Sequence, residues 1–188
     1  MISAFGKGEE MKIVMGPLTL ACPGWGLEGS RVTTLVAKGT EGRPDVLAAQ
    51  ILCGAALQGA RVVMLLPVAR EQDETWKMMI AQLADGNAKS AVQAMMGLSI
   101  SMYTCGAGWD RAERADLVYA PGLSARELRQ LDQKTKAPIL VIGKDFDRES
   151  SNRPVEKIRV GKDTLLIDSE GVEIPVVYDP SGPIYRPA

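Results

Sequence analysis

Short runs of apolar, often β-branched residues alternate with longer helical segments from about residue 31 onward. Residues 32–37 (VTTLVA) predict a first strand, and residues 61–66 (RVVMLL) form an unbroken apolar run that is typical of a strand covered on both faces. The segment between them predicts a helix from Pro44, a residue suited to the first helical position, to about Leu57. This alternation predicts a three-layer, Rossmann-like α/β fold with a mostly parallel sheet.

The alternation continues toward the middle of the chain. Apolar residues at helical spacing predict further helices, with Trp76, Met79, Ile80 and Leu83 in a first segment and Ala91, Met95 and Met96 in a second. Three more strands are predicted, over residues 99–105, 115–120 and 138–142. Ser124 and Glu127 have the spacing of a capping box, so we expect a short helix to begin there.

The pattern changes after residue 147. Residues 148–154 are polar and predict a linker, and residues 157–168 and 172–178 predict two strands. The first of these strands resembles residues 11–21, so we expect one small accessory sheet or hairpin built from both ends of the chain. The proline-containing tail is expected to be extended and free to dock elsewhere. The chain is thus divided into an N-terminal β extension (1–30), an α/β core (31–147) and a C-terminal hairpin with its tail (148–188).

Composition limits the ligands that the protein is expected to bind and the cellular compartment in which it is expected to work. The formal charge of -1 comes from intermixed acids and bases, so no basic stripe favours nucleic acid. Residues 46–68 are apolar but interrupted by polar side chains, so no membrane span is predicted, and residues 1–11 lack the apolar core of a signal peptide. The three cysteines lie far apart without a CxxC pair, which fits a reducing environment, and we expect a cytoplasmic protein.

The absence of histidine is the sharpest chemical fact in the sequence. It excludes Ser-His-Asp and Cys-His catalysis, and also the common histidine-bearing zinc sites. We therefore predict no metal site and no conventional catalytic residues.

A glycine-containing loop joins the first predicted strand to the first predicted helix. Parallel α/β folds bind phosphates at this position, because glycines let backbone N–H groups approach an anion at a helix N-terminus. The candidate ligand-binding residues are Lys38, Gly39, Thr40, Gly42 and Arg43. A P-loop carries Lys and Ser or Thr where Arg43 and Pro44 stand. The loop is thus either a nucleotide-binding loop or a tight turn without a ligand.

From Lys38, the run KGTEGRPDVLAAQILCGAALQGARVVMLL resembles the deviant Walker A loop, helix and second strand of ParA/MinD-type partition and positioning ATPases. Trp76 stands where many smaller members of that family carry a tryptophan. The runs AGWDRAERADLVYAPGLSARELRQL and PILVIGKDFD resemble later segments of the family, so the resemblance covers about residues 31–147. It implies a protein that associates with itself and with partners, as in partition, positioning or an assembly scaffold.

The departures from that family affect its chemistry. Lys38 matches the signature lysine, but Arg43 and Pro44 replace the phosphate-binding lysine and the magnesium-binding hydroxyl. Leu66 and Val68 stand where acidic residues are expected. The resemblance therefore implies a member that has lost ATP hydrolysis, with ATP or another nucleotide as at most a weakly bound ligand. We expect a homodimer or higher oligomer with protein partners.

Two alternatives remain open. The phrases LVAKGTEG, ADLV and APILVI resemble strands of universal stress proteins, which implies a nucleotide sensor. Cys105 ends a predicted strand and precedes a glycine. It resembles the cysteine of DsrE-like proteins, which follows a similar strand, and this resemblance implies a small thiol or sulfur-transfer protein.

Overall fold

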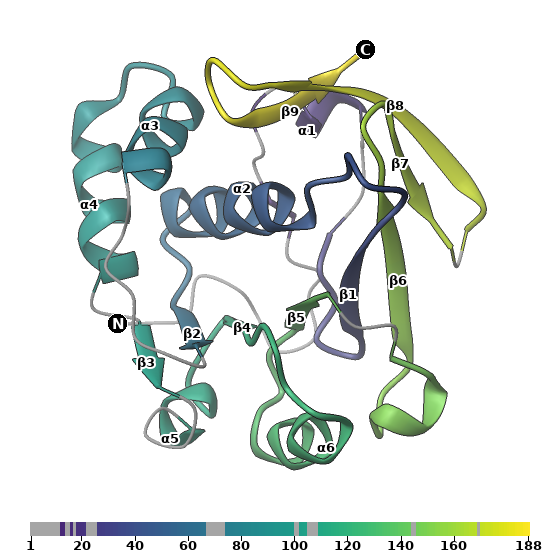
Figure 1. The fold of residues 1–188 in the computed structure, drawn as a ribbon. Helices are drawn as coiled ribbons and strands as arrows, with labels where there is room; N and C mark the ends of the chain where they lie inside the picture. Colours follow the sequence, from purple (N-terminus) through teal and green to yellow (C-terminus); the bar gives the residue numbers. More distant parts are fainter. Residues whose placement is uncertain are drawn as a thin grey trace.

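The described residues form a nine-stranded sheet in the order β3-β2-β4-β5-β1-β6-β7-β8-β9 (Figure 1). This computed structural model describes residues 12–13, 16, 18–21, 26–66, 74–99, 102–104, 109–143, 146–168 and 170–188. The strands from β3 to β6 are parallel, and β7, β8 and β9 extend the sheet in antiparallel fashion. The predicted α/β fold with a mostly parallel sheet is confirmed.

The first β–α–β unit has the predicted bounds. Strand β1 (Val32–Ala37) is followed by helix α2 (Pro44–Leu57) and strand β2 (Val62–Leu66). Pro44 occupies the first turn of α2, where its missing N–H leaves no hydrogen bond unmade. Most of α2 is buried, which explains why its sequence is apolar nearly all round.

The middle of the chain supplies helices to both faces of the sheet. Its elements are α3 (Glu74–Leu83), α4 (Ala88–Ser99), β3 (Met102–Thr104), α5 (Trp109–Ala112), β4 (Leu117–Tyr119), α6 (Ala125–Lys134) and β5 (Ile139–Ile142). The capping box predicted at α6 is confirmed, with the Glu127 amide donating to Ser124 Oγ at 3.3 Å and the Ser124 amide donating to the Glu127 carboxylate at 2.8 Å. Among the described residues of the strand predicted over 99–105, Met102–Thr104 form β3, whereas Ser99 belongs to α4.

Alternate residues of the parallel strands enter two separate cores. In β2, Met64 faces the core under α2, α3 and α4, whereas Leu65 faces the core under α5 and α6. Both side chains are almost fully buried. Burial on both faces is why these strands read as continuous apolar runs and not as alternating ones.

The C-terminal strands extend the main sheet. They are β6 (Val155–Val160), β7 (Thr164–Ile167), β8 (Val172–Asp179) and β9 (Ile184–Pro187). The single strand predicted over residues 157–168 is wrong, because the chain turns after Val160 and the Gly161 amide donates to the Thr164 carbonyl at 2.8 Å. Strand β6 pairs with β1 along its whole length. The strands after residue 147 therefore belong to the same sheet as the strands before it.

The two ends of the chain differ from the sequence-based expectations. Among the described residues of 11–21, the element formed is a short helix, α1 (Leu18–Ala21), and not a strand. The tail predicted to be free is paired instead, since β9 joins the sheet edge at β8 and contacts α1 and α2. The division into three units stays a prediction. None of the described helices is long and apolar enough to cross a membrane.

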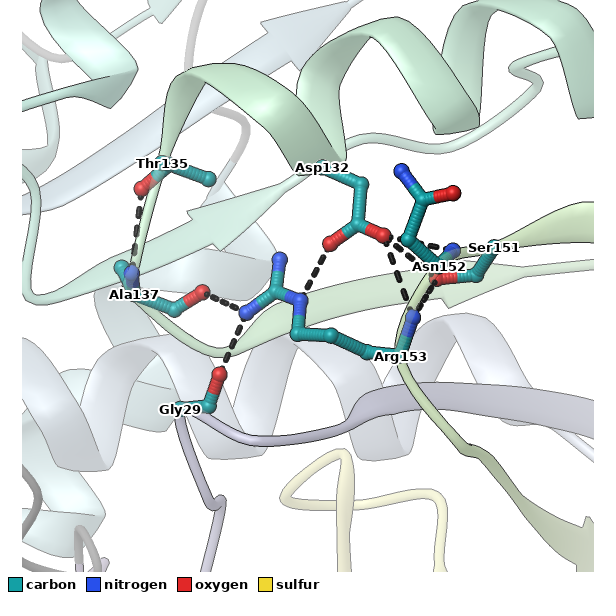
Figure 2. A network of polar contacts seen from close by, with 7 residues as sticks. All are labelled: Gly29, Asp132, Thr135, Ala137, Ser151, Asn152 and Arg153. Carbon is teal, nitrogen blue, oxygen red and sulfur yellow. Dashed lines mark hydrogen bonds and ion pairs between the residues drawn. The ribbon is translucent and has the colours of Figure 1, made fainter.

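The polar segment predicted as a linker is held against α6. After a short 3-10 helix, η1 (Arg148–Ser150), the Asp132 carboxylate accepts hydrogen bonds from the Ser151 hydroxyl at 2.9 Å and from the backbone amide of Asn152 at 2.7 Å (Figure 2). Arg153 forms an ion pair with Asp132 and donates to the carbonyls of Gly29 and Ala137. The Asp132 side chain is 1% exposed. These contacts join the approaches to β1, β5 and β6, so the linker prediction is wrong.

Candidate functional site

The loop between β1 and α2 is packed against the end of β6. The Lys38 amide extends the strand pairing by donating to the Val160 carbonyl at 2.7 Å. Gly39 then turns the chain in the left-handed region, with φ of 78°. Gly42 lies so close to β6 that a Cβ atom on it would meet the Val160 carbonyl oxygen at 1.9 Å. The loop therefore follows the strand edge tightly.

The backbone amide immediately before α2 is bonded to a side chain from the last strand. Arg43, the residue before α2, donates its backbone N–H to the hydroxyl of Tyr185 at 3.0 Å. That hydroxyl in turn donates to the Gly161 carbonyl at 3.2 Å. Burial raises the pKa of Tyr185, so the hydroxyl keeps the proton that this second bond needs. Tyr185 thus occupies a position where a helix N-terminus could otherwise receive an anion.

The carboxylate of Asp45, in the first turn of α2, lies at the same helix end. The Asp45 carboxylate binds the Arg43 guanidinium through two hydrogen bonds, of 3.0 Å from Nε and 2.7 Å from Nη2. The Arg43 side chain and the backbone amides of Val46 and Asp45 hold the pKa of Asp45 below its usual value, although burial opposes the shift. Arg43 also lies over the ring of Tyr178, with Cζ 5.8 Å from its centroid. Its charge is therefore already matched by a carboxylate and an aromatic face.

A buried glutamine fixes the position of Tyr185. Gln50 lies on α2 and is fully buried. Its Nε2 donates to the Tyr185 carbonyl at 3.1 Å, and its Oε1 accepts from the Tyr185 amide at 2.8 Å. This pair of bonds replaces the strand partner that an edge strand lacks on its outer side. Gln50 therefore holds β9 against α2 in a defined register.

Ion pairs join the loop to the C-terminal strands. Lys38 Nζ lies 3.4 Å from a carboxylate oxygen of Glu173, and Lys162 Nζ lies 3.3 Å from one of Glu41. All four side chains are largely exposed, so each pair contributes little to stability. The pairs matter for the charge of the loop, because Lys38 and Glu41 each lie beside a side chain of opposite charge.

The structure places the predicted site residues in one loop but gives them internal partners. Lys38 pairs with Glu173, Arg43 pairs with Asp45, and Gly42 contacts β6. Thr40 is exposed on the loop, next to Gly39. Cys105 lies outside the described residues. The described residues contain no group of three or more His, Cys, Asp or Glu side chains that could hold a metal ion.

Sequence reasoning missed the two residues that close the loop. Tyr185 stands in a short tail between prolines, where no periodic pattern marks it as buried. Gln50 gave a better signal, because it is a polar residue in the middle of an otherwise apolar helix. A fully buried amide must find hydrogen-bond partners, which points to a segment packed across α2.

Replacing Gly42 by alanine tests how tightly the loop follows β6. The new methyl group would overlap a backbone carbonyl that belongs to the β1–β6 pairing, so we expect the free energy of unfolding to fall by about 2–3 kcal/mol. Gly39→Ala is the matched control, since no atom lies within 4 Å of a Cβ there and only the left-handed backbone is strained, by about 1 kcal/mol. Urea unfolding of both variants measures the difference, and equal losses would contradict the tight packing of Gly42.

Comparison with known proteins identifies the fold. No family model matches the sequence, and no curated protein does. Among solved structures, a KaiC-like protein from the hyperthermophilic archaeon Pyrococcus horikoshii OT3 matches with a TM-score of 0.54 and 14% sequence identity. The alignment covers 96% of this chain and 100% of that one. The chain therefore shares the α/β fold of this KaiC-like protein, and at this identity the likeness establishes the fold alone.

Proposed function

We propose that this protein is a non-hydrolysing member of the P-loop-type fold that acts by associating with itself and with protein partners. The observation that carries the proposal is the occupied N-terminus of α2, where the Arg43 amide donates to Tyr185 and the Asp45 carboxylate lies at the first turn. In P-loop proteins this helix end receives the phosphates.

The electrostatics of the loop support the same proposal. A triphosphate needs uncompensated positive charge and free backbone amides at the helix end. Here the Arg43 guanidinium is held by Asp45, and the Lys38 ammonium is paired with Glu173. A phosphate arriving at the loop would compete with the Asp45 and Glu173 carboxylates for these two cations. It would also meet the Arg43 amide already bonded to the hydroxyl of a fully buried tyrosine.

The closer kinship to ParA/MinD-type proteins is a proposal that rests on the sequence. Its support is the run from Lys38 through β2 and the later run that contains ADLV. On this reading the protein serves partition, positioning or a related assembly as a scaffold, and its nucleotide chemistry has been replaced by fixed internal contacts.

The test combines nucleotide turnover, nucleotide binding and mass. We expect no phosphate release above the buffer background with Mg-ATP. A nucleotide present at a hundred times its Kd would stabilise the protein by about 2.7 kcal/mol, so a thermal-shift assay at millimolar ATP detects even weak binding. Light scattering of the same samples reports the assembly state, which we expect to exceed a monomer and to be independent of ATP.

Two controls sharpen this test. Tyr185→Phe frees the Arg43 amide, and Asp45→Asn removes the carboxylate from the helix end. If either variant gains an ATP-dependent shift that the wild-type protein lacks, internal occupation is the reason for the lost binding. Turnover of Mg-ATP by the wild-type protein would refute the proposal.

A further inference from the structure

The exposed face of α6 is basic, although its sequence contains both signs of charge. The exposed residues of the helix and of the turn after it are Arg126, Arg129, Gln130, Gln133, Lys134 and Lys136. The acids of the helix are drawn away from this face. Glu127 accepts bonds from Ser124 in the capping box, and Asp132 is buried against Arg153. The exposed residues of this face therefore include four cations and no carboxylate, although the sequence of the helix contains charges of both signs.

These four cations have no ion-pair partner in the part of the chain that the structure describes. The rest of the chain has the opposite balance, because 18 of the 22 basic residues remain to face 23 acidic ones. The α6 face and the rest of the chain thus carry net charges of opposite sign, although the formal charge of the chain is only -1. Such asymmetry favours a partner whose surface is acidic, and it disfavours a polyanion that the rest of the surface would repel.

An acidic counterpart lies on the same chain at a different place. Asp168 and Glu170 lie in the turn between β7 and β8, and Glu173 lies at the start of β8. All three are exposed, and residues 168–173 contain no basic residue. Asp168 and Glu173 make surface pairs with Arg159 and Lys38, which hold them weakly, and the Glu170 carboxylate has no ion-pair partner among the described residues. In Figure 1 this turn projects from the sheet edge, apart from α6 at the bottom of the view. The two surfaces cannot meet within one chain.

We infer that the basic face of α6 binds the acidic β7–β8 turn of a second copy of this chain, in a head-to-tail contact. This inference rests on the proposed function and names the surfaces through which the protein associates with itself. Because the two surfaces differ, the contact leaves one of each free and can continue to a ring or a filament. Because the contact is electrostatic, it weakens as the Debye length falls from about 10 Å at 0.1 M salt to about 3 Å at 1 M.

A reciprocal charge exchange tests the contact. One variant, Arg126→Glu/Arg129→Glu, cancels the net positive charge of the α6 face, and another, Glu170→Lys/Val172→Lys, cancels the negative charge of the β7–β8 turn. Each variant alone is expected to lose self-association at low salt, with a Kd raised at least about tenfold. Mixed together they are expected to associate again, because each then offers the surface that the other lacks. Analytical ultracentrifugation at low and high salt measures all of these samples.

The control Lys89→Glu/Gln93→Glu adds comparable negative charge to the exposed face of α4 and should associate like the wild-type protein. If the wild-type protein associates and the two charge variants do so equally well, the inferred surfaces are wrong and the proposed function stands. If the wild-type protein is monomeric at every salt concentration, the inference is overturned together with self-association in the proposed function. Loss of binding to DNA or to anionic vesicles by Arg126→Glu/Arg129→Glu, with no effect on mass, would also overturn it.

Discussion

Replacing Asp132 by alanine is expected to lower the free energy of unfolding by about 3–5 kcal/mol, because it leaves the largely buried guanidinium of Arg153 without its counter-charge. The same substitution removes the acceptor of the Ser151 hydroxyl and of the Asn152 amide. Urea unfolding measures the loss. Asp163→Ala, at an exposed aspartate in the turn after β6, is the matched control and should change the free energy by less than about 0.5 kcal/mol.

The pH dependence provides a second measurement of the same ion pair. Burial raises the pKa of Asp132, but the hydrogen bonds from Ser151 and Arg153 outweigh it and leave the pKa below its ordinary value. A carboxyl with a lowered pKa in the folded state contributes its full stabilisation above its unfolded-state pKa of about 4. This stabilisation is lost as the pH falls below that value and through the lower pKa of the folded state. The difference in free energy of unfolding between the wild-type protein and Asp132→Ala should therefore be largest at pH 7 and become smaller below about pH 4. A difference that is equal at pH 7 and pH 3 would contradict the ion pair.

Local patterns were enough to predict the parallel half of the sheet. Pro44 marked the start of α2, and the unbroken apolar run of β2 indicated burial on both faces. The capping box of Ser124 and Glu127 marked the start of α6. Each of these signals depends on residues that lie within a few positions of one another, which is the range over which propensity and periodicity act.

The contacts that close the fold are long-range, and no local pattern encodes them. Asp132 and the amide of Arg153 are 21 residues apart, and Gln50 and Tyr185 are 135 residues apart. Their sequence surroundings are polar or rich in proline, so residues 148–154 read as a linker and the tail read as free. A buried polar group requires a partner, but the sequence does not say which segment supplies it.

The candidate loop shows the same limit at the level of function. The sequence indicated that Arg43 and Pro44 depart from a phosphate-binding motif, and it left a nucleotide site and a plain turn as alternatives. The structure shows a third arrangement, in which residues from the far end of the chain occupy the helix terminus. A motif judged only by its own residues cannot reveal this arrangement, because the occupant is Tyr185.

Replacing Tyr185 by alanine is expected to lower the free energy of unfolding by about 3–5 kcal/mol, the range for large-to-small changes of a buried aromatic residue. Its side chain is 0% exposed and lies 5.7 Å from the ring of Tyr178, centroid to centroid. Urea unfolding measures the total loss.

Tyr185→Phe distinguishes the contribution of the Tyr185 hydroxyl to stability from that of its ring. It keeps the packing and removes the bonds to the Arg43 amide and the Gly161 carbonyl, so we expect a loss of about 1–3 kcal/mol and faster hydrogen exchange at the Arg43 amide. Tyr178→Phe is the matched control, because the half-buried Tyr178 makes no hydroxyl hydrogen bond to any described residue, and it should change neither quantity. If Tyr185→Phe behaves like Tyr178→Phe, the hydroxyl does not hold the end of α2. The closed loop would then depend on Gln50 and the packing of β9 alone, because these are the remaining contacts that keep the last strand against the helix.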